Sequence, residues 1–214
     1  AQAQELGYAE ANPAADVDGL DIQRKLIISA NVAYDCLLTE SDVPTFGIRN
    51  ITDGDIRTFT EAGYVCKLVA AALPTANGVA AWIEPTLLPA RTMMAAVPAN
   101  FNLISFVGEN AGEQSFYGQG AGRFPTAYNL VQDCIDILGG AKGFYGSLGG
   151  RVEQGSHAHP YYVRTIAKSD WLDSITDHTL GDGIVTAPVS NLQMHDFMSS
   201  ISGADPDAFM AGIR

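Results

Sequence analysis

The stretch Ala15-Asp16-Val17-Asp18-Gly19-Leu20-Asp21-Ile22-Gln23-Arg24-Lys25-Leu26-Ile27-Ile28-Ser29 has the pattern of a tight turn followed by a helix. Asp18 is suited to be the N-cap, because its carboxylate can accept a backbone N–H of the first turn. Asp21 follows at the position of a capping-box acid, and Val17 and Ile22 occupy the positions of a hydrophobic staple. The stretch therefore predicts a helix over residues 19–34.

Asp21 and Lys25 are four positions apart, so both side chains lie on one helix face. At about 100° per residue, Ile22, Ile28 and Val32 flank Lys25 on that face. We therefore expect Lys25 to be partly desolvated, which would lower its pKa and suit it to proton transfer. The alternative is an exposed ion pair that contributes little to stability, and the spacing alone favours this alternative.

Acidic residues gather around the start of this helix. Four of them fall within twelve positions with no basic residue among them: Glu10, Asp16, Asp18 and Asp21. Such a group is typical of a site for a cation or for an ammonium substrate, and equally of a solvated acidic loop.

Two segments resemble the homoserine dehydrogenase family. The first begins Gly7-Tyr8-Ala9-Glu10-Ala11-Asn12-Pro13 and continues through Asp16 to Gly19-Leu20-Asp21-Ile22-Gln23-Arg24-Lys25. It is similar to the family's catalytic segment, Gly-Tyr-x-Glu, Pro, Asp, then Gly-x-Asp-x-x-Arg-Lys at the start of a helix. The second is Gly118-Gln119-Gly120-Ala121-Gly122-Arg123-Phe124-Pro125-Thr126-Ala127. The resemblance covers about residues 1–138, in the order in which the family has these segments.

The resemblance implies a role for each matching residue. Lys25 would exchange a proton with the substrate oxygen while Asp21 orients it. Glu10 and Asp16 would bind the substrate's ammonium group, which needs anionic acceptors at fixed positions, and Tyr8 would line the pocket. The reaction implied is the NAD(P)-dependent interconversion of L-homoserine and L-aspartate 4-semialdehyde, a step in threonine, methionine and isoleucine biosynthesis.

The glycine segment does not have the dinucleotide-binding fingerprint, because Arg123 stands where the third glycine would be and no acidic residue follows at the required distance. The resemblance implies instead that Gly122, with Gly120, touches the cofactor. Glycine suits this role because only a backbone without a side chain can approach a phosphate or ribose closely.

The sequence has no strand–turn–helix unit with that fingerprint, which the family carries at its N-terminus. We therefore expect a fragment that lacks the nucleotide-binding domain, cannot bind NAD or NADP by itself and is inactive alone. The family also implies a homodimer that pairs through its sheet. The alternative function is a non-catalytic dimerisation or amino-acid-sensing module of the same fold, which would not need the acids and the lysine.

Composition excludes other classes of function. The net charge of −12 makes nucleic acid an unsuitable partner, because phosphate binding needs a basic face. There is no run of about 18 apolar residues that would span a membrane. Three cysteines without a CxxC pair indicate reduced thiols in a cytoplasmic protein.

Histidines give no metal site. His157 and His159 form a pair in a glycine-rich segment without supporting ligands, so we interpret them as part of a solvated loop. His178 and His195 are isolated in the sequence.

The order of segments predicts an α+β fold, a mixed and mostly antiparallel sheet with helices on one face. We expect helices at 52–62, 124–138 and 190–200, and strands at 64–73, 79–87, 101–107, 113–117, 161–166 and 183–186. The domain division we expect is a catalytic and dimerisation domain (1–138), a glycine-rich linker (139–159) and a small C-terminal extension (160–214).

Overall fold

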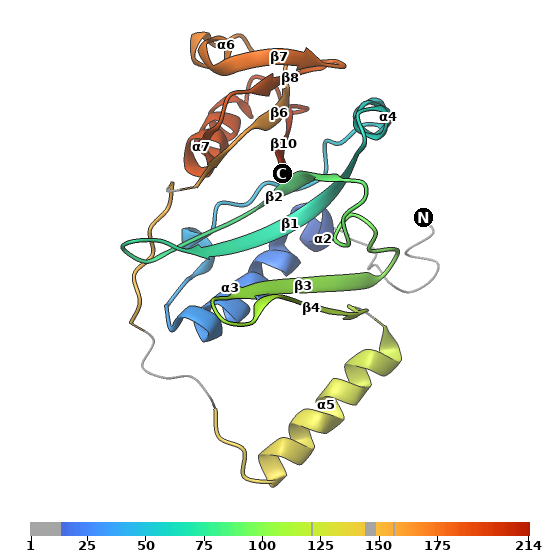
Figure 1. Cartoon of the computed structure of the whole chain (residues 1–214), viewed down its shortest axis with the longest axis vertical. Coiled ribbons are helices and arrows are strands. Elements are labelled where there is room, and N and C mark those ends of the chain that lie inside the picture. Colours follow the sequence, from blue (N-terminus) through green and yellow to red (C-terminus); the bar gives the residue numbers. More distant parts are fainter. Residues whose placement is uncertain (1–13, 121, 144–148, 156) are drawn as a thin grey trace. The chain divides into compact units, whose positions relative to one another are not determined.

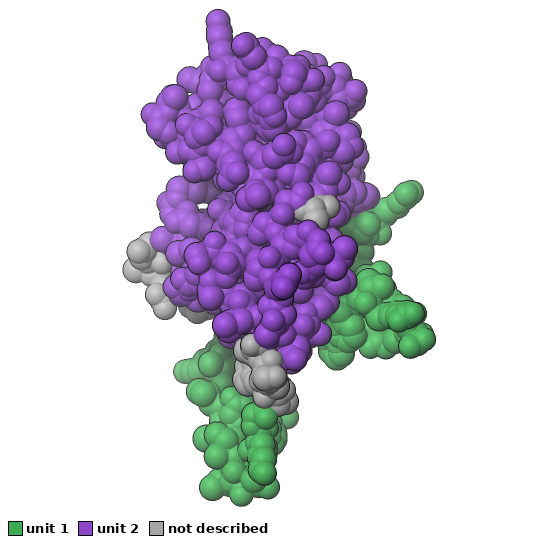
Figure 2. Space-filling model, turned by 90° about the vertical axis from the view of Figure 1, so that its left-hand side faces the viewer, with its two compact units in different colours: residues 1–13, 91–144 green, residues 14–90, 145–214 purple. Residues whose placement is uncertain are grey.

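The computed structural model describes residues 14–120, 122–143, 149–155 and 157–214. These residues form two compact units (Figure 2). One unit contains the described residues between 91 and 143. The other contains residues 14–90 together with the described residues from 149 onward.

The larger unit is built on a six-stranded sheet (Figure 1). Its strands lie in the order β1 (Tyr64–Pro74), β2 (Val79–Pro89), β10 (Phe209–Ile213), β6 (Tyr161–Arg164), β8 (Gly183–Thr186) and β7 (Thr176–Leu180). Neighbouring strands are antiparallel except β2 and β10, which pair in parallel with Gly212 opposite Thr86. The predicted α+β class and mostly antiparallel sheet are confirmed.

The long hairpin β1–β2 is in register along its whole length, from the pair Tyr64 and Pro89 to the pair Pro74 and Val79. Its turn closes where Thr75 N–H donates to the Gly78 carbonyl at 2.8 Å. Residues 149–155, expected to be a flexible linker, lie along this hairpin. The Val79 N–H donates to Arg151 and the Glu153 N–H donates to Val79, both at 2.9 Å.

Helix α3 (Leu20–Tyr34) follows the short helix α2 (Ala14–Val17) and packs on β1 and β2 through Ile22, Leu26 and Ile27. The predicted N-cap is wrong. Gly19 occupies that position with a φ of 83°, and no side chain caps the helix. The carboxylate of Asp18 instead accepts hydrogen bonds from Arg49.

Helix α4 (Asp53–Glu61) begins as predicted, with a capping box in which Thr52 and Asp55 bond to each other's backbone N–H. Gly63 ends the segment with a φ of 82°, a conformation that favours glycine. The helix packs on the sheet through Phe59, whose ring meets Tyr162 edge-on at 4.8 Å. A single turn of 3-10 helix, η1 (Glu40–Asp42), precedes it in the chain.

The C-terminal part is a β-α-β-β-α-β unit, an arrangement that recurs in many folds. It consists of β6, α6 (Asp170–Ile175), β7, β8, α7 (Asn191–Ile201) and β10. A short ladder of β5 (Ala158–His159) with β9 (Val189–Ser190) lies beside it. The strands of the expected small C-terminal extension (160–214) continue the sheet of β1 and β2.

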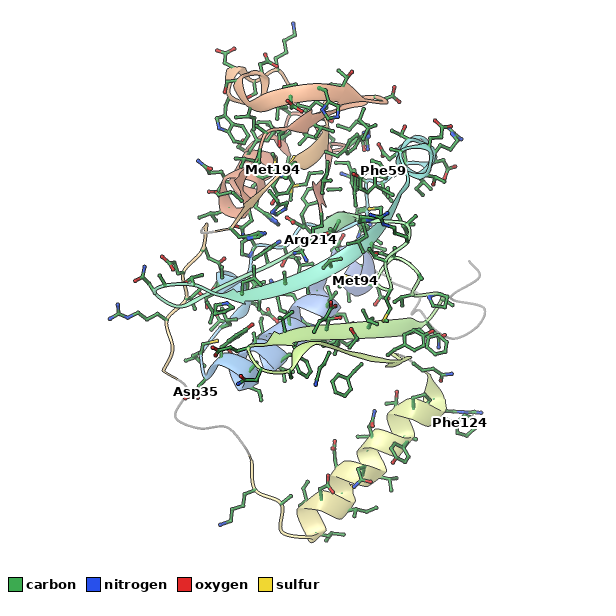
Figure 3. The ribbon with its side chains drawn as sticks, in the orientation of Figure 1. Asp35, Phe59, Met94, Phe124, Met194 and Arg214 are labelled. Carbon is green, nitrogen blue, oxygen red and sulfur yellow. The ribbon has the colours of Figure 1, made fainter. Side chains whose placement is uncertain are left out.

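Helices cover the sheet in two groups. Alternate residues of a strand face opposite sides, and the odd-numbered Ile83 and Leu87 of β2 pack in the cores formed with α3 and α4. Tyr161 and Met210 face the other side, where they pack with Met194 of α7. Phe59 and Met194 mark these two cores in Figure 3.

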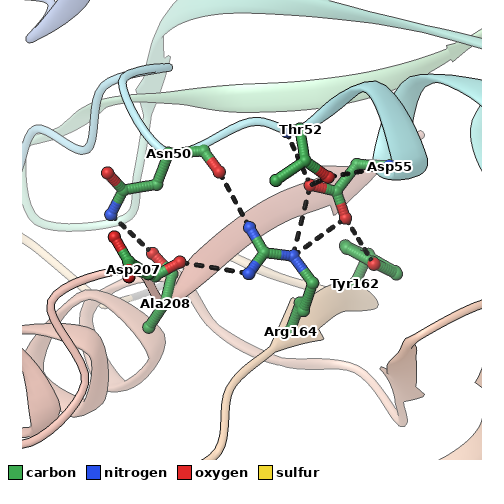
Figure 4. Close-up of polar contacts among 7 residues, drawn as sticks. All are labelled: Asn50, Thr52, Asp55, Tyr162, Arg164, Asp207 and Ala208. Carbon is green, nitrogen blue, oxygen red and sulfur yellow. Dashed lines mark hydrogen bonds and ion pairs between the residues drawn. The ribbon is translucent and has the colours of Figure 1, made fainter.

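A buried ion pair joins α4 to the C-terminal strands (Figure 4). Arg164 Nε lies 3.0 Å from Oδ1 of Asp55, which also accepts the Tyr162 hydroxyl at 2.8 Å. The Arg164 guanidinium also donates a hydrogen bond to the carbonyl of Asn50 at 2.8 Å. Burial raises the pKa of Asp55, but hydrogen bonds from Thr52, Tyr162 and Arg164 outweigh it and leave that pKa below its usual value.

The smaller unit contains the antiparallel pair β3 (Phe101–Gly108) and β4 (Gly112–Gln119), followed by helix α5 (Arg123–Leu138). These elements lie close to the predicted bounds. Within the part of the chain that the structure describes, no helix is both long and apolar enough to cross a membrane.

Candidate active site

The predicted pair on α3 is formed. Lys25 Nζ lies 2.7 Å from Oδ2 of Asp21, as the spacing of four positions requires. The two side chains are 52% and 48% exposed, however, so the expected desolvation of Lys25 is wrong for the described chain. Ile28 and Val32, which share its face, are also exposed.

The buried face of α3 is the opposite one, and it includes polar residues. Gln23 is 5% exposed, and its side-chain amide donates to the carbonyls of Glu40 and Val43 and to the Thr45 hydroxyl at 2.9–3.1 Å. These bonds satisfy the buried amide and hold the first turns of α3 against the 40–45 segment. The orientation of this helix, and hence of Lys25, is therefore fixed by Gln23 as well as by apolar packing.

The turn from α2 into α3 is closely packed. A Cβ atom at Gly19 would lie 3.1 Å from Cγ2 of Thr45 and 3.3 Å from Cγ2 of Ile83. Asp16 lies just before this turn with an exposed side chain. Tyr8 and Glu10, the other predicted substrate-binding residues, lie outside the described residues.

The predicted cofactor-binding glycines belong to the smaller unit. The Gly120 N–H donates to the Asn100 carbonyl at 3.0 Å, and a side chain at Gly120 would overlap the amide of Asn102. Gly122 precedes α5 with a φ of 136°, which strongly favours glycine, and a Cβ there would meet only the ring of Pro125. The backbone at Gly122 therefore favours glycine for local reasons, whereas a side chain at Gly120 would have to displace the Asn102 amide. The role of both glycines toward a cofactor stays a prediction.

A sequence model of the homoserine dehydrogenase family matches residues 1–135 of the chain. The chain belongs to the homoserine dehydrogenase family. The match includes Asp16, Asp21 and Lys25 and both glycines.

Individual relatives agree with this assignment. The chain is 40% identical over 137 residues to homoserine dehydrogenase of Bacillus subtilis, covering 64% of this chain and 32% of the relative. It is 41% identical over 137 residues to the NAD(+)-dependent homoserine dehydrogenase of Pseudomonas canavaninivorans, covering 64% of this chain and 39% of the relative. The chain thus spans about a third of the length of such relatives.

Solved structures match the whole chain. A homoserine dehydrogenase from Thiobacillus denitrificans superposes with a TM-score of 0.78 at 25% identity, over 100% of this chain and 57% of that one. Homoserine dehydrogenase of Staphylococcus aureus gives a TM-score of 0.70 at 24% identity with the same coverage, a likeness of fold. The likeness to these homoserine dehydrogenases therefore extends past residue 135, where the sequence match ends.

Glu84 forms a buried polar cluster that joins the region of the family match to the region after residue 135. Its Oε1 accepts Trp82 Nε1 at 3.0 Å and lies 2.8 Å from His159 Nε2. Its Oε2 accepts the Tyr161 hydroxyl at 3.0 Å and lies 3.1 Å from His195 Nε2. Burial alone would raise the pKa of Glu84, but the hydrogen bonds and positive charge of the two histidines lower it to about 2.

This cluster corrects two interpretations. His159 is buried rather than part of a solvated loop, and His195 is paired rather than isolated. His157 stacks on Trp82 at 4.9 Å, and burial lowers its pKa. The sequence feature that could have revealed this cluster is Glu84, the single acidic residue of an apolar strand that is buried from Val79 to Leu88. A buried carboxylate needs partners that bond to it.

The cluster is not suited to hold a metal or to bind a further ligand. Both carboxylate oxygens of Glu84 are already engaged, and no group of three His, Cys, Asp or Glu residues in the described ranges could hold a metal ion.

Proposed function

We propose that this chain is the catalytic portion of a homoserine dehydrogenase that interconverts L-homoserine and L-aspartate 4-semialdehyde, using NAD or NADP, in the synthesis of aspartate-derived amino acids in the cytoplasm. The observation that carries this proposal is the Asp21–Lys25 pair at 2.7 Å, inside the segment that matches the family. Glu10, Asp16, Asp21 and Lys25 all match the family's catalytic segment. A scaffold without catalysis needs none of these four residues, which argues against the non-catalytic alternative.

In this proposal Lys25 donates a proton to the aldehyde oxygen of the semialdehyde, and in the reverse direction removes it from the homoserine hydroxyl. Asp21 accepts a hydrogen bond from the ammonium of Lys25 and so directs it. Asp16 and Glu10 bind the ammonium group of the substrate, and Tyr8 lines the pocket.

The nicotinamide cofactor supplies hydride transfer when it is bound. Of the residues that the structure describes, the glycine turn fits contact with it, since the backbone at Gly122 carries no side chain and a Cβ there meets only Pro125. We expect a nucleotide-binding domain to hold most of the cofactor, and the choice between NAD and NADP to be made there.

The proposed assembly is a homodimer. Ile104 and Phe116 pair across β3 and β4, and Phe106 stacks on Phe116 at 5.6 Å on the same face. All three side chains are exposed in the single chain. A second copy would cover this apolar face. Light scattering at micromolar concentration should give twice the chain mass, and Phe116→Asp should give a monomer; a monomeric parent protein would contradict the assembly.

The activity is tested in a chimera in which this chain replaces the segment it matches in the Bacillus subtilis relative. The chimera should oxidise L-homoserine with reduction of NAD or NADP. Lys25→Ala should abolish most of this activity. Arg24→Ala is the matched control, because Arg24 forms an exposed ion pair with Glu40 at 2.9 Å on the same helix. A folded chimera without activity, or equal loss in both variants, would contradict the proposal.

A further inference from the structure

Arg49 forms a two-point ion pair with Asp18. Arg49 Nε donates to Oδ1 at 2.8 Å and its terminal nitrogen donates to Oδ2 at 2.7 Å. These hydrogen bonds lower the pKa of Asp18, which therefore stays ionised. A bidentate pair fixes the orientation of both groups as well as their distance, so Arg49 fixes a residue two positions from Asp16.

The backbone beside Arg49 holds the same turn. Ile48 N–H donates to the Val17 carbonyl at 2.7 Å. A side chain at Gly47 would overlap that carbonyl, so the two backbone segments approach as closely as glycine permits. Residues 47–49 thus contact the turn between α2 and α3 through both backbone and side chain.

The ion pairs neutralise two of the acidic side chains in this segment and leave a third without a cationic partner among the residues that the structure describes. Asp18 is neutralised by Arg49 and Asp21 by Lys25. Within the described ranges, the Asp16 carboxylate makes no ion pair. Among the described acids of this segment, Asp16 is therefore the one left unneutralised for an approaching ammonium group.

The ion pair between Arg49 and Asp18 is expected to add little to the stability of the fold. Its two side chains are 58% and 39% exposed, and exposed ion pairs contribute little to folding. Its main effect is therefore to fix the orientation of Asp18 in the turn between α2 and α3.

We propose that Arg49 is a positioning residue for the substrate. By holding and neutralising Asp18, it directs the ammonium of homoserine to Asp16 and keeps the turn that presents Asp16 in place. This inference rests on the proposed function.

The first test uses the chain itself. The amide N–H groups of Asp18 and Gly19 donate within the turn, to Ala14 at 2.9 Å and to Asp16 at 3.3 Å. Hydrogen exchange at these amides should be several-fold faster in Arg49→Ala than in the parent chain. Arg57→Ala, which removes an exposed arginine of α4, is the control and should leave them unchanged. Unchanged exchange in Arg49→Ala would overturn the proposal.

The second test uses the chimera. Arg49→Ala should raise KM for homoserine about tenfold while kcat changes less than about threefold, and Tm should stay near the parent value. Arg49→Lys should rescue part of the effect, because lysine keeps the charge but loses the bidentate geometry.

If Arg49 acts through Asp18, the double variant Asp18→Ala/Arg49→Ala should be no worse than Arg49→Ala alone. Additive losses, or a fall in Tm without a change in KM, would overturn the proposal. The Lys25→Ala variant distinguishes a failure of the proposed function from a failure of this inference. Active Lys25→Ala contradicts the proposed function, whereas inactive Lys25→Ala with an unchanged KM in Arg49→Ala contradicts this inference alone.

Discussion

Glu84 Oε1 lies 2.8 Å from Nε2 of His159, although the two residues are 75 positions apart and the first is fully buried. Through this contact and the bond to His195, the carboxylate connects the hairpin β1–β2 to the C-terminal β-α-β-β-α-β unit. A buried carboxylate without partners would be strongly unfavourable, so the stability of this junction depends on all of its donors.

Glu84 should make the stability of the larger unit depend on pH. Its folded-state pKa of about 2 lies below the ordinary value of 4.5, so its contribution is present above about pH 4.5 and is lost as pH falls toward 2. That difference corresponds to about 3 kcal/mol of unfolding free energy. Glu84→Gln should be less stable at pH 6 and lose less stability on acidification. Urea unfolding at a series of pH values measures this, and parallel curves for both proteins would refute it.

Gly212 should not tolerate a side chain. A Cβ there would lie 2.6 Å from His159 Nε2 and 2.7 Å from Glu84 Oε1. Gly212→Ala should therefore push the cluster apart and lower stability by about 1–3 kcal/mol. Gly203→Ala is the control, since nothing lies within 4 Å of its added atom. Equal melting temperatures for the two variants would show that the junction is looser than described.

Asp55 should be a second strong determinant of stability. It completes the capping box of α4 and pairs with Arg164 and Tyr162 in a buried position. Asp55→Ala should cost about 3–5 kcal/mol, because it leaves Arg164 without its partner. Asp53→Ala, at an exposed position in the same helical turn, should change stability by less than about 0.5 kcal/mol. Chemical denaturation of both variants measures the difference, and a small effect at Asp55 would argue against the network.

Local signals were sufficient for several elements. The helix expected at 52–62 and the strands expected at 64–73 and 79–87 depend on residues close together in sequence, and the structure has them as α4, β1 and β2. The family segments likewise identified the chain from contiguous motifs.

Long-range contacts were not predictable in this way. Periodicity shows that Lys25 shares a face with Ile28 and Val32, but it does not say which face of α3 is buried. Gln23 and Asn31 can lie on the buried face because backbone groups of the following loop form hydrogen bonds with their side-chain amides. Gln23 donates to the carbonyls of Glu40 and Val43, and Asn31 bonds to the N–H and the carbonyl of Leu38. The partners of Glu84 come from β6, β5 and α7, and no spacing in the sequence brings these together.

Lys25 is central to the proposed function, and its structural setting sharpens the test. The Asp21–Lys25 pair is half-exposed, so its removal should cost at most about 1 kcal/mol of stability. Asp21→Asn should lower kcat as well, by disturbing the charge and direction of Lys25. Loss of activity in these variants therefore cannot be attributed to unfolding if Tm is unchanged.

The most direct measurement is kcat for homoserine oxidation by Lys25→Ala and Arg24→Ala chimeras, with Tm determined on the same preparations. Positioned proton transfer contributes on the order of 10²–10⁴-fold. Lys25→Ala should therefore lose that factor in kcat at nearly unchanged Tm, while Arg24→Ala keeps its activity. A kcat near the parent value in folded Lys25→Ala would contradict the assignment of Lys25 as the proton-transfer residue.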